Sequence, residues 1–132
     1  MLPRANRLAS RQDYARIYAR GKHWRSSLVS IYAYPRAGTE PRFGISVSKK
    51  VGGAVQRNLV KRRLREICRS MTRLSPPPLD MIIVAREPTL TADFETLSEA
   101  VNRLAQRAIE EGFSWVSERA RAARRGRRRP PA

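Results

Sequence analysis

Residues 47–70, with the sequence VSKKVGGAVQRNLVKRRLREICRS, constrain the fold of this chain more than any other stretch. Residues 42–48 alternate between apolar and small polar side chains, and after Gly52 and Gly53 the period changes to that of a helix. At about 100° per residue, five apolar side chains share one arc of that helix. They are Val60, Leu64, Ile67, Cys68 and Met71. The stretch predicts a strand, a glycine turn and a helix packed on a core.

An adjacent arc of the same helix, about 100° wide, carries hydrogen-bond donors. Its members are Asn58, Lys61, Arg62, Arg65 and Arg69. Like charges three or four residues apart destabilise an isolated helix by about 0.2–0.5 kcal/mol per pair, so bound phosphates are the expected relief. The helix N-terminus favours anions, the two glycines allow a close approach, and Lys49 and Lys50 precede them. A solvated cationic face without a specific partner is the alternative.

The charge of the whole chain favours a polyanionic partner. Its 28 Lys and Arg against 11 Asp and Glu give a formal net charge of +17 in 132 residues, with a pI near 11.6. Most of these cations are arginines, whose planar guanidinium suits phosphates and bases better than a membrane surface, although a GC-rich genome also enriches arginine. No apolar run approaches the roughly 20 residues that span a bilayer, and no secretory signal is seen, so we expect a cytoplasmic protein without membrane contact.

The remaining pattern predicts an α+β sandwich, in which helices pack on a small mixed sheet in the order helix, strand, strand, helix, strand, helix. The expected strands are 28–34, 42–48 and 81–85, and the last is apolar on both faces and therefore central. A first helix begins at Ser10 and ends at Gly21. A long helix covers 91–111, and Gly112 follows as a natural C-terminal residue. Its apolar stripe is Phe94, Leu97, Val101, Leu104, Ala108 and Ile109.

The chain divides into one RNA-binding domain, residues 1–116, and an Arg-rich tail, residues 117–132. From Arg119 onward the tail contains no acid and no large apolar side chain. Such a composition cannot form a core, so we expect the tail to be disordered.

Aromatic side chains gather on two predicted faces. Tyr14 and Tyr18 share one face of the first helix, and Tyr32 and Tyr34 share the less apolar face of the first strand. Single-stranded nucleic acid is commonly held by such platforms, at about 1–3 kcal/mol per stacked base. Tyrosines on amphipathic elements are more often core residues with a surface hydroxyl, and we expect this of Tyr34.

Several reactive residue types are not expected to be catalytic. His23 lies in an expected turn without an adjacent acid, and Cys68 lies on the apolar arc. We expect solvation to account for Asp80 and helix capping for Asp93 and Glu95, rather than metal binding. Trp24 and Trp115 are expected to pack rather than stack on RNA.

The basic stretch resembles the RNR motif of the bacterial ribonuclease P protein component. The matching residues are Lys49, Lys50, Gly52, Ala54, Val55, Arg57, Asn58, Lys61, Arg62, Arg65 and Glu66. The segment LPRANRLASRQDYARIYARG is similar to the first helix of that family, and DMIIVARE to a later strand. Leu59 departs from the pattern, because the family often has a basic residue there.

The resemblance implies a fold like domain 2 of ribosomal protein S5, with a left-handed βαβ crossover. It implies an accessory protein in an endoribonuclease whose RNA subunit holds Mg²⁺ and removes the 5′ leader of precursor tRNA, with no catalytic residue in the protein. The implied contacts to the RNA subunit are Lys49, Lys50, Arg57, Asn58, Lys61, Arg62, Arg65 and Arg69. Tyr14, Tyr18 and Tyr32 are implied to line the leader cleft. A ribosomal or other structural RNA-binding protein, and a nuclease that acts without RNA, are the alternatives.

Overall fold

The computed structural model describes the backbone of residues 2–36, 40–73 and 78–127, and the side chains of these ranges up to residue 111. A single four-stranded sheet, in the order β1-β2-β4-β3, forms the middle of the described part of the chain. Its strands are β1 (Lys22–Arg25), β2 (Val29–Pro35), β3 (Arg42–Val47) and β4 (Leu79–Ala85). The helices are η1 (Arg4–Asn6), α1 (Arg11–Arg20), α2 (Ala54–Thr72), η2 (Glu87–Leu90) and α3 (Phe94–Arg127).

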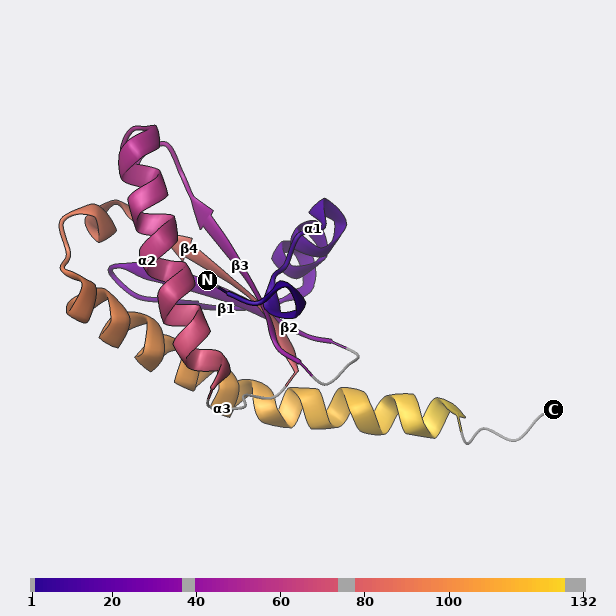
Figure 1. Ribbon diagram of the computed structural model, residues 1–132. Helices are drawn as coiled ribbons and strands as arrows, with labels where there is room; N and C mark the ends of the chain where they lie inside the picture. The colour runs from indigo at the N-terminus through magenta and orange to yellow at the C-terminus, as the bar shows by residue number, and fades with distance from the viewer. Residues whose placement is uncertain (1, 37–39, 74–77, 128–132) are drawn as a thin grey trace.

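The helices cover the two faces of the sheet unequally (Figure 1). Helices α2 and α3 pack on one face over the main core, to which β4 contributes Met81 and Ile83. Helix α1 lies on the other face, where Ile17 and Leu8 pack on Ile82. Because β4 is buried on both faces, it takes the central position that its uninterrupted apolar sequence predicts.

Two adjacent parallel strands, β3 and β4, are joined through α2. Phe43 pairs with Met81 and Ile45 with Ile83, while β4 runs antiparallel to β2 and β2 to β1. The mixed sheet with a βαβ crossover confirms the predicted α+β class. The five apolar residues predicted for the core arc of α2 are all buried.

Helix α1 has the ends that its sequence predicts. The Ser10 hydroxyl accepts hydrogen bonds from the backbone N–H groups of Gln12 and Asp13, and Gly21 follows the last helical residue. A serine in this role stabilises a helix by about 1 kcal/mol.

Strand β1 was not predicted, because residues 22–25 were expected to form part of a turn. They pair with β2 instead, with His23 opposite Tyr32 and Trp24 opposite Ile31. Trp24 is 6% exposed and belongs to the main core, as expected of its packing. Four residues with one buried side chain are too few to show a period of two, which explains the omission.

The predicted bounds of the last helix were wrong. Helix α3 begins at Phe94, and the preceding Asp93 caps it, since its carboxylate accepts a hydrogen bond of 2.7 Å from the Thr96 N–H. The helix continues through Gly112 to Arg127. Phe94 is 43% exposed, so this first helical residue does not belong to the buried stripe. Alanine and arginine are strong helix formers and outweigh one glycine, so the helical backbone also crosses the expected domain boundary after residue 116. The side chain of Trp115 and residues 128–132 lie outside the described part.

Candidate nucleic-acid interface

Helix α2 presents donors on its exposed side while its apolar side is anchored in the core. Asn58, Arg62 and Arg65 are exposed, and Lys61 is half-buried beside them. Gly53 precedes the helix without a side-chain cap, and the first turn contains no acid. The first backbone N–H groups of α2 therefore keep their preference for an anion. We call Lys49, Lys50, Arg57, Asn58, Lys61, Arg62, Arg65 and Arg69 the cationic flank.

Most of the cationic flank is free of the chain's own carboxylates. Within the described residues, Arg57, Lys61, Arg62 and Arg65 form no ion pair. Arg69 differs, because its guanidinium lies 2.7 Å from the Glu66 carboxylate. Hydrogen bonding from Arg69 lowers the pKa of Glu66, which keeps this exposed pair ionised. Arg69 is thus the flank member with a competing intramolecular partner.

Arg57 lies closer to the core arc than the other cations of α2. One hundred degrees per residue places it between Leu64 and Cys68, within the angular range of the buried stripe, and its side chain is half-buried. Its Nε atom is buried without a hydrogen-bond partner among the described residues. A buried donor without a partner costs about 1–3 kcal/mol, a cost that is relieved only if the side chain moves toward a partner.

Lys49 and Lys50 occupy the turn between β3 and α2, and both are exposed. The turn is closed by a 3.1 Å hydrogen bond from the Val51 N–H to the Ser48 carbonyl, and the buried Val51 side chain anchors it. Lys50 also lines a hollow of about 480 Å³ with Ser48 and Arg86, where the parallel strands β3 and β4 end. The turn extends the positive surface beyond the N-terminus of α2.

Three aromatic rings meet on the opposite face of the sheet. Tyr18 of α1 contacts Tyr32 of β2 edge to face, with ring centroids 4.8 Å apart. His23 of β1 stacks on the same Tyr32 ring at 4.2 Å, with the planes 9° from parallel. Tyr18 is 40% exposed and His23 is also exposed, so these rings are accessible. We call Tyr14, Tyr18, Tyr32 and His23 the tyrosine face.

His23 is the member of this face that sequence reasoning missed. Residues 22–25 are too few to show the period of a strand, so the sequence offered no clear signal for His23. Pairing of β1 with β2 places His23 beside Tyr32.

Tyr14 lies deeper than Tyr18, against β3. Its hydroxyl donates a 3.4 Å hydrogen bond to the Leu8 carbonyl, and burial raises its pKa. A Cβ on Gly44 would lie 2.5 Å from that hydroxyl, so only glycine leaves space for the ring at this point of β3. Tyr34 packs, as expected, against the apolar cluster of Leu8, Ile17 and Ile82. The Arg16 guanidinium lies 6.0 Å from the Tyr34 ring centroid.

An ionic network fixes α1 to the sheet beside these tyrosines. The Asp80 side chain is fully buried and accepts hydrogen bonds of 2.8 and 2.7 Å from Arg42, which raise the pKa of that guanidinium. Asp13 of α1 pairs with Arg42 at 3.4 Å and with Arg16 at 2.6 Å. The expectation that solvation explains Asp80 was therefore wrong, because the carboxylate is buried and strand register brings the half-buried Arg42 to it.

The other reactive groups have structural surroundings. Cys68 is completely buried, and desolvation raises the pKa of its thiol, so the thiolate needed for nucleophilic attack is disfavoured. Asp93 caps α3, as predicted. Within the side chains that the structure describes, no three His, Cys, Asp or Glu groups gather to form a metal site.

Comparison with known proteins decides the family. The family model described as Ribonuclease P matches residues 2–109, a span that includes both the cationic flank and the tyrosine face. The chain belongs to the ribonuclease P protein family. This family supplies the protein component of an endoribonuclease ribonucleoprotein that processes tRNA, so its members have an RNA partner.

Individual members of the ribonuclease P protein family match most of the chain. The component from Cyanothece sp. is 34% identical over 125 residues, covering 82% of this chain and 95% of its own. That from Roseiflexus castenholzii is 37% identical over 108 residues, covering 81% and 88%. Among solved structures, the Staphylococcus aureus protein has a TM-score of 0.72 at 29% identity, covering 80% and 96%. The Thermotoga maritima protein has a TM-score of 0.69 at 30% identity, covering 76% and 96%.

The match to the ribonuclease P family ends before the C-terminal part of α3, which extends beyond the sheet and its helices (Figure 1). None of the helices, in the part of the chain that is described, combines the length and apolar character needed to cross a bilayer.

Proposed function

We propose that this chain is the protein subunit of ribonuclease P and that its two surfaces bind different RNAs. The cationic flank binds the catalytic RNA subunit, and the tyrosine face binds the single-stranded 5′ leader of precursor tRNA. One observation carries this proposal. Arg57, Lys61, Arg62 and Arg65 project from a helix anchored in the core, and none has a carboxylate partner among the described residues.

The cationic flank suits a folded RNA because its charges are fixed in relation to one another. Each phosphate neutralised by a Lys or Arg releases counterions, which steepens the logarithmic salt dependence of binding by about 0.7–0.9. Binding of a phosphate by Arg57 would require its guanidinium to move outward, which would also release the buried Nε from a site without a partner. The uncapped N-terminus of α2 favours the same ligand.

The tyrosine face suits an unpaired strand because two of its rings, Tyr18 and His23, are exposed and the rings are already ordered. Tyr32 is held by an edge-to-face contact with Tyr18 and by stacking with His23, so little side-chain entropy is lost when a base stacks on this group of rings. The Asp13, Arg42 and Asp80 network keeps α1, and with it Tyr18, in place on the sheet. A duplex hides its base faces, so these rings favour the leader over the tRNA body.

We propose no catalytic residue in the protein and assign hydrolysis to the RNA subunit. The described side chains offer no cluster for Mg²⁺, so the metal belongs to the RNA in this proposal, where it would activate the attacking water. The protein neutralises phosphate charge near the cleavage site. This reduces the repulsion between the two RNAs and raises affinity for both precursor tRNA and metal ions.

Reconstitution tests the function. The purified chain is added to a bacterial ribonuclease P RNA at a magnesium concentration at which the RNA alone is inactive. We expect leader removal at the mature 5′ end of precursor tRNA. If the RNA still cleaves no precursor tRNA after the chain is added, the proposal is contradicted. Cleavage by chain freed of all RNA would assign catalysis to the protein instead, and copurification with ribosomal RNA alone would favour a structural RNA-binding role.

A further inference from the structure

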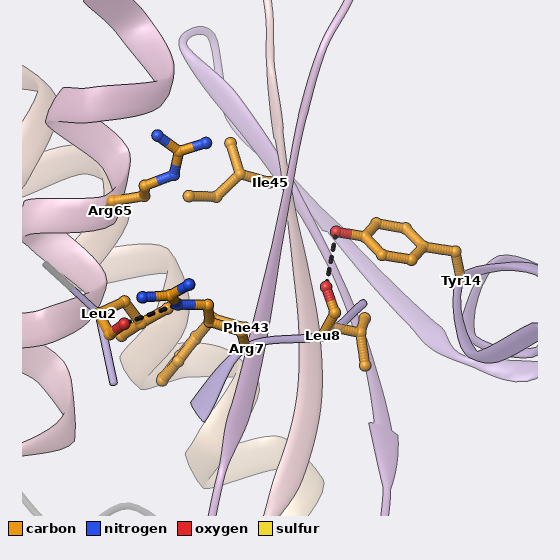
Figure 2. A pocket seen from close by; sticks show the side chains of 7 residues that line it. All are labelled: Leu2, Arg7, Leu8, Tyr14, Phe43, Ile45 and Arg65. Atoms are coloured by element: carbon orange, nitrogen blue, oxygen red, sulfur yellow. Dashed lines mark hydrogen bonds between the residues drawn. The ribbon is translucent and has the colours of Figure 1, made fainter. Parts of the chain in front are cut away.

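A hollow at the edge of β3 lies between the cationic flank and the tyrosine face (Figure 2). It has a volume of about 160 Å³, the space of several water molecules. Arg7 and Arg65 supply guanidinium groups on the side of β3 that faces α2, and the Tyr14 hydroxyl reaches the strand from the other side. Leu2, Phe43 and Ile45 contribute apolar walls, and no acid lines the hollow.

The N-terminal segment places Arg7 at this edge. The Leu8 N–H donates a 2.9 Å hydrogen bond to the Phe43 carbonyl, and Arg7 pairs with Phe43 as an isolated parallel bridge. The Arg7 Nε donates a 2.7 Å hydrogen bond to the Leu2 carbonyl, and the buried Leu2 side chain anchors that partner. These bonds orient the guanidinium and leave its two terminal nitrogens available.

Arg65 approaches the same hollow from α2, an element remote from residue 7 in the sequence. Its side chain is exposed, and neither Arg65 nor Arg7 pairs with a carboxylate in the described part of the chain. A hollow lined by charges of one sign attracts a counterion of the other sign. Two guanidinium groups beside an apolar wall suit a phosphate with an attached sugar better than a free inorganic ion.

We propose that Arg7 and Arg65 together bind one phosphodiester group of RNA at the edge of β3. The small volume limits the site to a single phosphate, whose ribose lies against Phe43 and Ile45. The site rests on the proposed function, since it takes RNA as its ligand, and it adds the N-terminal segment to the binding surface. The site lies between the cationic flank and the tyrosine face, at the boundary of the two proposed RNA surfaces.

A double-mutant cycle tests whether the two arginines share one phosphate. Binding is measured for Arg7→Gln, Arg65→Gln and the double variant, with Arg103→Gln on the exposed side of α3 as the matched charge control. Each single variant should weaken binding about tenfold. The double variant should bind little worse than either one, because the second change removes an interaction already lost. Losses that multiply, or no loss from Arg7→Gln, would overturn the shared site.

The source of the phosphate is distinguished by two forms of the assay. One measures the affinity of the chain for the RNA subunit alone, and the other measures the affinity of the assembled ribonucleoprotein for precursor tRNA with its leader. Coupled losses in the first form assign the phosphate to the RNA subunit, and coupled losses only in the second assign it to the leader. If neither form of the assay shows coupling between Arg7 and Arg65 while Arg62→Ala still weakens binding of the RNA subunit, this site is rejected and the proposed function stands.

A second measurement requires no variant and covers the case in which Arg7→Gln does not fold. The native chain labelled with ¹⁵N is titrated with inorganic phosphate while the Nε–H signals of its arginines are followed by NMR. The signals of Arg7 and Arg65 should shift together with one apparent Kd. A shift of Arg65 without Arg7 would overturn the proposal.

Discussion

The Asp80 carboxylate accepts two hydrogen bonds from the Arg42 guanidinium, at 2.8 and 2.7 Å, although the Asp80 side chain is completely buried. Asp80 is the second residue of the central strand and pairs with Arg42, the first residue of its parallel neighbour, so the pair locks the register of β3 against β4. Arg42 also reaches Asp13 of α1 at 3.4 Å. The strands that carry α2 and the helix that carries Tyr18 are therefore held by one guanidinium.

Replacing Asp80 by alanine should reduce the free energy of unfolding by about 3 kcal/mol, because it leaves a half-buried guanidinium without its main partner. Urea denaturation followed by circular dichroism measures the loss. Asp13→Ala is the matched control and should cost less, since Asp13 remains partly exposed. A loss for Asp80→Ala no larger than that of the control would show that the buried pair does not hold the sheet.

The contact between Gly44 and Tyr14 gives a second prediction. Gly44→Ala places a methyl group 2.5 Å from the Tyr14 hydroxyl and should lower the free energy of unfolding by about 1–3 kcal/mol. In a Tyr14→Leu background the same change should cost much less, because the ring that it meets is absent. Thermal or urea unfolding of the four proteins in this cycle provides the test. Equal costs in both backgrounds would place the clash elsewhere.

Leu59 occupies a position that is basic in the resembled motif, and it is 39% exposed on α2. Leu59 is also absent from the main core. Leu59→Arg should change the free energy of unfolding by less than about 0.5 kcal/mol. It should steepen the logarithmic salt dependence of RNA-subunit binding by about one unit, as expected of one added phosphate contact. Leu59→Gln, which adds polarity without charge, should leave the salt dependence unchanged.

Cys68 provides a test of the packing of α2. Its thiol is buried and burial raises its pKa, so it should resist a thiol reagent in the native chain and react after unfolding in urea. A raised folded-state pKa stabilises the fold at low pH, and this contribution is lost as the pH rises above about 8.5, the thiol pKa of an unfolded chain. Rapid labelling of the native chain at neutral pH would contradict the packing of the α2 core arc.

Hydrophobic periodicity predicted the elements whose burial is one-sided or complete. Val29, Ile31 and Ala33 alternate toward the core as expected, and Val60 and Leu64 show the helical period of α2. These patterns depend on residues close in sequence, so they can be recognised without knowing the pairing of the strands.

The features that could not be predicted depend on strand register or on competition between local preferences. Nothing near Asp80 in sequence indicates Arg42 as its partner, and nothing near His23 indicates its stacking on Tyr32. Both contacts follow once β4 pairs with β3 and β1 with β2. Gly112 has a local preference to end a helix, but the Ala- and Arg-rich sequence after it continues α3.

The central claim is that the two surfaces bind different RNAs, and crossed affinity measurements on Arg62→Ala and Tyr18→Ala test it most directly. Kd is measured for the RNA subunit, and then for precursor tRNA with and without its leader on the assembled ribonucleoprotein. Arg62→Ala should weaken RNA-subunit binding and reduce its salt slope by about one unit, whereas Tyr18→Ala should leave it unchanged. Tyr18→Ala should weaken only the leader-bearing substrate, by about 1–3 kcal/mol. Two results would contradict the division of the surface. One is that Tyr18→Ala weakens binding of substrates with and without the leader equally, and the other is that Tyr18→Ala weakens RNA-subunit binding as much as Arg62→Ala does.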